Sequence, residues 1–152
     1  MRFNVAYILA PCWIALAHAQ EHGHEHPQMH KTASNNPLIT ITINPEARVS
    51  VMRTGDPPPS ASCGTALELP VKLLNQAFVT FSLEATLVDS IPNVAAIEFP
   101  VEPLVGTREE SRVLRLTLRK PGDADVTISF HAKNDVPDLG GRDRVHLLLH
   151  CS

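Results

Sequence analysis

The residues best suited to chemistry are the histidines near the beginning of the chain. Half of the eight histidines in this 152-residue sequence lie between residues 22 and 30. Neutral imidazole is a good ligand for copper, zinc and nickel, and a thioether adds a soft ligand that favours Cu(I). We therefore predict a transition-metal site, copper favoured over zinc or nickel, whose ligands are His22, His24, His26, Met29 and His30.

The segment before these histidines has the pattern of a secretory signal peptide. Arg2 supplies a positive start, residues 5–17 are mostly apolar, and Ala17 and Ala19 form a small-residue cleavage pattern. The apolar run is shorter than the about 20 residues that a transmembrane helix needs. The sequence predicts a signal peptide over residues 1–19, a periplasmic or secreted mature protein, and no stable membrane insertion after cleavage.

The elements that carry this segment have the pattern of β-strands. Residues 20–36 are polar, lack apolar periodicity and are expected to form a flexible tail. From residue 37 onward, apolar and polar residues alternate with a period of two, which is typical of half-buried strands. The clearest inward rows are Ile39, Ile41 and Ile43; Leu114, Leu116 and Leu118; Val126, Ile128 and Phe130; and Val145, Leu147, Leu149 and Cys151.

Turns rich in proline and glycine separate these strands and indicate an all-β fold. We predict an immunoglobulin-like antiparallel β-sandwich of roughly 7–8 strands with little helix over residues 37–152, and a closed barrel is the alternative. Pro70 lacks a backbone donor, so its strand is expected at a sheet edge or broken. The mixed-charge run 108–112 is expected to be a solvated loop.

The cysteines predict one disulfide bond. Of the three cysteines, Cys12 falls in the predicted signal peptide, which leaves Cys63 and Cys151. An even number of cysteines in an exported chain indicates a disulfide. This bond would tie the last strand to the start of an early one, with Cys151 in phase with the inward Leu149.

The cleavage position decides what the new amino terminus offers a metal. Cleavage after Ala19 places His22 third from a free amine, so that amine, two amides and imidazole can surround Cu(II) or Ni(II) in one plane. Cleavage after Ala17 makes His18 the first residue instead. On a β-sandwich this position resembles the copper brace of lytic polysaccharide monooxygenases and of periplasmic copper-binding proteins. The resemblance implies a copper-dependent oxidase as an alternative, but the chain lacks an aromatic surface for a polysaccharide.

A second candidate metal cluster depends on how the last strands pair. His146 and His150 share the outer face of one strand, about 13 Å apart at the usual strand rise. His131 lies on the outer face of the preceding strand, so a hairpin would bring it toward one of the other two. His131, His146 and His150 are only the second candidate, because exposed histidines on strands are more often solvated surface than metal ligands.

These features favour a binding protein over an enzyme. The net charge of −3 and the dispersed basic residues exclude a typical nucleic-acid surface. The chain shows no nucleophile elbow, no paired catalytic carboxylates and no phosphate-binding loop. The sequence therefore predicts an exported β-sandwich for metal trafficking or buffering. The alternative is a structural or interaction module that contacts a periplasmic protein and uses the histidine-rich tail only as a spacer.

Overall fold

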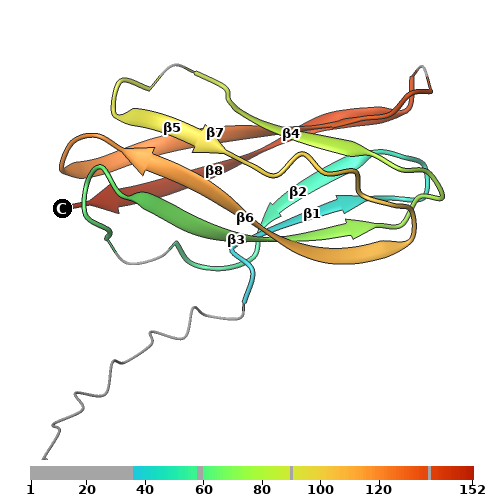
Figure 1. The fold of residues 1–152 in the computed structure, drawn as a ribbon, viewed down its shortest axis with the longest axis horizontal. Coiled ribbons are helices and arrows are strands. Elements are labelled where there is room, and N and C mark those ends of the chain that lie inside the picture. The colour runs from blue at the N-terminus through green and yellow to red at the C-terminus, as the bar shows by residue number, and fades with distance from the viewer. Residues whose placement is uncertain (1–35, 58–59, 90, 137) are drawn as a thin grey trace, which may run out of the picture. The chain divides into compact units, whose positions relative to one another are not determined.

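The computed structural model describes residues 36–57, 60–89, 91–136 and 138–152. The predicted signal peptide and residues 20–35 of the predicted tail lie outside the described residues. Within the described ranges the chain folds into strands packed in two layers, with no helix (Figure 1). The strands are β1 (Ile39–Ile43), β2 (Val49–Arg53), β3 (Ala66–Asn75), β4 (Ser82–Leu87), β5 (Val94–Glu98), β6 (Arg108–Leu118), β7 (Gly122–Lys133) and β8 (Gly140–Cys151).

The two layers are a five-stranded and a three-stranded sheet. Their strand orders are β2-β1-β3-β6-β5 and β4-β7-β8. All pairings are antiparallel except that of β1 with β3, which is parallel. This exception arises because β2 runs back along one side of β1 to the level where β1 began, and the following loop leads to β3 on the other side of β1. The predicted all-β sandwich is confirmed, and the pairing of β1 with β3 is its one parallel pairing among the described strands.

The core lies between the sheets and is built from the predicted alternating rows. Burying apolar side chains in this way removes them from water and supplies most of the stability of such a domain. Phe130 on β7 is fully buried, and its ring meets that of Phe99 edge to face with centroids 5.5 Å apart. The inward rows that we predicted are all buried: Ile39, Ile41, Ile43, Leu114, Leu116, Leu118, Val126, Ile128, Phe130, Val145, Leu147, Leu149 and Cys151.

Pro70 does not lie at a sheet edge. Its strand, β3, is the middle strand of the larger sheet, between β1 and β6. The missing donor costs little because the parallel ladder with β1 starts one residue later, at Val71 opposite Ile39. At Pro70 itself only the carbonyl is used, and it accepts a hydrogen bond from Leu38 N at 2.9 Å.

The run 108–112 is the first part of β6 and not a loop. It pairs with the end of β3, where Lys72 and Glu109 form an ion pair of 2.8 Å. Arg112 is only 8% exposed because its guanidinium is satisfied locally. It donates to Glu110 Oε1 at 2.6 Å and to the carbonyl of Pro100 at 3.0 Å. The run 108–112 thus forms a strand because it pairs with β3, although its charged composition by itself indicates a solvated loop.

The predicted disulfide between Cys63 and Cys151 is present. It joins the segment before β3 to the last residue of β8, and the two cysteines are 88 positions apart in the sequence. Backbone hydrogen bonds flank it, from Cys63 N to Ser152 O and from Ser152 N to Ala61 O. Figure 1 shows the carboxyl terminus beside the segment that leads into β3. The bond therefore fastens the end of one sheet to the other.

Reduction of this disulfide is expected to destabilise the fold. The Cys63→Ala/Cys151→Ala protein should lose about 2–4 kcal/mol of unfolding free energy, because its unfolded chain regains the freedom that the bond removes. Denaturant unfolding measures the loss. Wild-type protein under reductant is the control for packing changes at the buried Cys151. Identical midpoints for oxidised and reduced wild type would contradict the prediction.

Gly140 is required where β8 begins. Its φ of 115° is rarely adopted by residues with a side chain, and a Cβ would lie 2.3 Å from the Ala132 carbonyl oxygen. Gly122 has a nearly equal φ of 119° but open space around it. Gly140→Ala should therefore lose about 1–3 kcal/mol more unfolding free energy than Gly122→Ala. Equal losses in denaturant unfolding would show that the contact with Ala132 is unimportant.

Among the residues that the structure describes, no helix is long and apolar enough to cross a membrane.

Candidate functional site

The histidines of the described domain all lie on the outer face of the β4–β7–β8 sheet, which we call the histidine face. Alternation explains this placement, because the residues on either side of each histidine on these strands point into the core. The antiparallel register then sets the neighbours of each histidine. His131 lies opposite Glu84 on β4 and Arg142 on β8, His146 opposite Thr127, and His150 opposite Asp123.

His150 forms a directed pair with the residue across the hairpin. Its Nδ1 lies 2.7 Å from Asp123 Oδ1. An ionised carboxylate can only accept a hydrogen bond, so this contact places the proton of the neutral ring on Nδ1. The other nitrogen, Nε2, then keeps its lone pair. A carboxylate that holds a histidine in this manner is a common second partner of metal-binding imidazoles.

His146 forms a similar pair along the diagonal of the same hairpin. Its Nε2 contacts Asp125 Oδ1, so in the neutral ring Nδ1 is the nitrogen with a free lone pair. Both pairs are well exposed to solvent. The histidine face thus presents two imidazoles, each oriented by a carboxylate and each with one nitrogen available to a ligand.

His131 has a different environment from the other two. Burial lowers its pKa below the ordinary 6.5, and the positive charges of Arg142 and Lys133 lower it further, while Glu84 acts in the opposite direction. Glu84 itself pairs with Lys133, whose Nζ lies 2.5 Å from its Oε2. That hydrogen bond is the main reason why the pKa of Glu84 is lowered. Burial and the neighbouring cations thus favour the neutral form of the His131 ring.

The structure does not bring His131, His146 and His150 together. The predicted hairpin is present, but its register sets His131 opposite Arg142, four residues from His146 along β8. This separation is about 13 Å at the usual strand rise, too far for one ion. Within the described residues no group of three or more histidine, cysteine, aspartate or glutamate side chains could hold a metal ion. The candidate ligands His22, His24, His26, Met29 and His30 lie outside the described residues.

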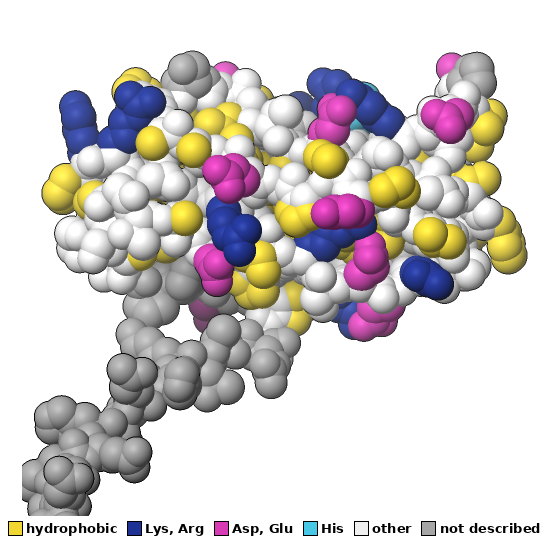
Figure 2. All heavy atoms as spheres, in the orientation of Figure 1, with side chains coloured by type: hydrophobic (Ala, Val, Ile, Leu, Met, Phe, Trp, Pro, Cys, Tyr) yellow, Lys and Arg dark blue, Asp and Glu magenta, His cyan; other side chains and the backbone are white. Residues whose placement is uncertain are grey.

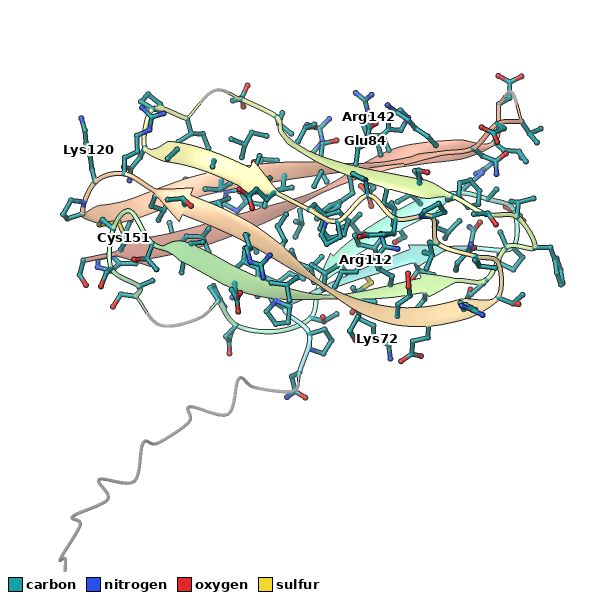
Figure 3. The ribbon with its side chains drawn as sticks, viewed as in Figure 1. Lys72, Glu84, Arg112, Lys120, Arg142 and Cys151 are labelled. Atoms are coloured by element: carbon teal, nitrogen blue, oxygen red, sulfur yellow. A yellow bond between two sulfur atoms is a disulfide. The ribbon has the colours of Figure 1, made fainter. Side chains whose placement is uncertain are left out.

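The outer surface near His131 contains a shallow depression. It has a volume of about 410 Å³, and His131, Lys133, Asn134, Asp138 and Gly140 are among the residues that line it. Figure 3 labels Arg142 and Glu84, which project from the same side of the sandwich next to each other. In the space-filling view, basic, acidic and histidine side chains adjoin at this position (Figure 2).

Sequence reasoning missed the partners of His146 and His150. Asp123 and Asp125 follow a Pro-Gly turn and were not recognised as candidate site residues. The available signal was their spacing, because both aspartates continue the outward-facing row of β7, the strand on which they lie. Finding the pairs also needed the register of the hairpin, because a shift of one residue moves every side chain to the other face.

Comparisons with known proteins identify the fold and nothing finer. No family model matches the sequence, and no curated protein matches it. Among solved structures, the chain is similar to the ASH / PapD-like domain of human CEP192 (PapD-like domain 7), with a TM-score of 0.50 and 14% sequence identity. The match covers 93% of this chain and 98% of that chain. The predicted immunoglobulin-like sandwich is thereby confirmed, in its PapD-like form.

The environment of His131 predicts a pH-dependent contribution to stability. Because its pKa is lower in the folded chain, the unfolded chain binds this proton at higher pH. The stabilising contribution of neutral His131 is complete above pH 6.5 and declines as the pH falls from 6.5 toward the folded pKa. The variant His131→Gln should lack this decline when denaturant unfolding is followed across that interval.

A second variant separates the causes of this effect. Arg142→Gln removes one of the two positive neighbours and should raise the pKa of His131 toward 6.5, as measured by an NMR titration of its imidazole. A pKa of His131 above 6.5 in the wild-type protein would contradict both expectations.

Proposed function

We propose that this chain is an exported β-sandwich protein that binds a transition metal ion, with copper favoured over zinc or nickel. The ligands are His22, His24, His26, Met29 and His30, and the function is metal trafficking or buffering. The observation that carries the proposal is the number of donors directly after the leader-like segment. Five soft or borderline donors within such a short stretch exceed the four that a tetrahedral or planar site needs.

The disulfide of the folded domain supports an oxidising compartment. Structural disulfides form and persist in secreted and periplasmic proteins and are rare in the cytosol. The Cys63–Cys151 bond is therefore in keeping with export of the mature chain to the periplasm or the medium. In that location the histidine-rich segment meets metal ions that are not controlled by cytosolic thiols.

The folded domain serves in this proposal as the carrier of the metal-binding segment. His146 and His150 each offer a single nitrogen, so either imidazole alone binds an ion weakly. They are auxiliary ligands at most. The role that we propose is binding, without turnover.

A metal titration tests the proposal. Wild-type protein purified after export should bind Cu(II) more tightly, by more than about tenfold or 1.4 kcal/mol, than a variant with the four histidines changed to Gln and Met29→Leu. Native mass spectrometry of the same samples reports the first residue and the bound metal. The control, His146→Gln/His150→Gln, should bind copper like wild type. Equal binding by the wild type and the tail variant would refute the proposal.

The second candidate function is a protein-interaction module. The side chain of Phe78 is 90% exposed in the loop between β3 and β4. The neighbouring loop adds Val105, which is 47% exposed, and the two loops are joined by a hydrogen bond from Thr107 N to Ala77 O. Exposed aromatic groups of this kind often anchor protein contacts. If the tail variant binds metal as the wild type does, this candidate is the one that remains.

A further inference from the structure

A group of basic side chains on the histidine face has too few acidic partners. Arg142 and Arg144 lie on the same side of β8 because they are two residues apart, at a separation of about 6.6 Å along the strand. Lys133 lies on β7 next to His131. We call Lys133, Arg142 and Arg144 the basic cluster. Across the sheet, Arg144 lies opposite Ser129, which in turn lies opposite Thr86 on β4, so hydroxyl side chains border the cluster.

The carboxylates near the basic cluster do not neutralise it. Lys133 is paired with Glu84. Within the described residues neither Arg142 nor Arg144 forms an ion pair. The nearest carboxylate in sequence, Asp143, points to the other side, where it accepts hydrogen bonds from Val51 N at 2.7 Å and from Arg144 N at 2.8 Å.

Two further carboxylates, Asp135 and Asp138, belong to the turn of the β7–β8 hairpin and form no ion pair with either arginine. Asp138 borders the depression beside Lys133, toward the turn of the β7–β8 hairpin. The two arginines lie farther from this turn than Lys133 does, next to Ser129 and His131. Burial is the main reason why the pKa of His131 is lowered, and the positive charges of Arg142 and Lys133 lower it further, against the opposite effect of Glu84.

We propose that Arg142 and Arg144 form a binding site for a small tetrahedral oxyanion, sulfate or phosphate. Guanidinium groups present parallel N–H donors that match the oxygens of such an anion, and two of them on one side of a strand can flank it. Ser129 lies opposite Arg144 and Thr86 lies opposite Ser129, so two hydroxyl side chains share this face with the arginines. This site is separate from the metal ligands of the proposed function and does not depend on them.

Inorganic sulfate is the probe that tests the site, because its charge is constant while His131 titrates. We expect sulfate to raise the pKa of His131 in the full chain and to shift its imidazole signals with saturation, against chloride at equal ionic strength. Arg142→Gln and Arg144→Gln should each weaken sulfate binding by about fivefold or more. Glu84→Gln should strengthen binding, because it removes the carboxylate that pairs with Lys133.

Arg115→Gln is the matched control. Arg115 lies on the other sheet, its side chain is 50% exposed, and it pairs with Glu68 at 3.1 Å. Its loss changes the net charge by the same amount but leaves the basic cluster intact, so sulfate binding should be unchanged. The proposal is overturned if Arg115→Gln weakens binding as much as Arg142→Gln does. It is also overturned if sulfate affects His131 no more than chloride does, or if Glu84→Gln weakens binding.

Discussion

The register of the β7–β8 hairpin determines most of what this domain presents to its surroundings. It runs without interruption from Gly122 opposite Cys151 to Lys133 opposite Gly140. One alternation thus sends Val145, Leu147 and Leu149 into the core and the histidines outward. The same register brings Cys151 to the level of the segment before β3, where Cys63 lies. A slip by one residue would expose the apolar row and separate both the disulfide and the histidine–aspartate pairs.

Much of the fold could be predicted because period-two alternation is a strong local signal. A strand such as β6 carries apolar residues (Leu114, Leu116 and Leu118) on one face and polar residues on the other. Two sheets packed against each other bury only the apolar face of each sheet, so this alternation predicts a sandwich. The signal failed where long-range pairing outweighed local composition. Pro70 is accommodated in a middle strand because its carbonyl alone is used, and Glu109 in the run 108–112 pairs across the sheet with Lys72 of β3. Neither compensation is visible without the partner strand.

The candidate site was less predictable than the fold for the same reason. The types and positions of His146 and His150 showed that they share a face, and the structure agrees. Their partners Asp123 and Asp125, and the cations around His131, depend on contacts between strands. Predictions that concern the amino-terminal donors rest on residue chemistry alone, since His22 and its neighbours lie outside the described residues.

The stability of the domain depends little on the exposed charges of its histidine face. Exposed ion pairs such as Lys133–Glu84 are screened by solvent and contribute little, so the fold does not depend on them. Its stability resides in the apolar layer between the sheets and in the bond between Cys63 and Cys151. Charges on this face can therefore be changed one at a time with little effect on folding. A loss of binding after such a change then reports on the ligand contact itself, which is what allows the basic cluster to be distinguished from an ordinary solvated surface.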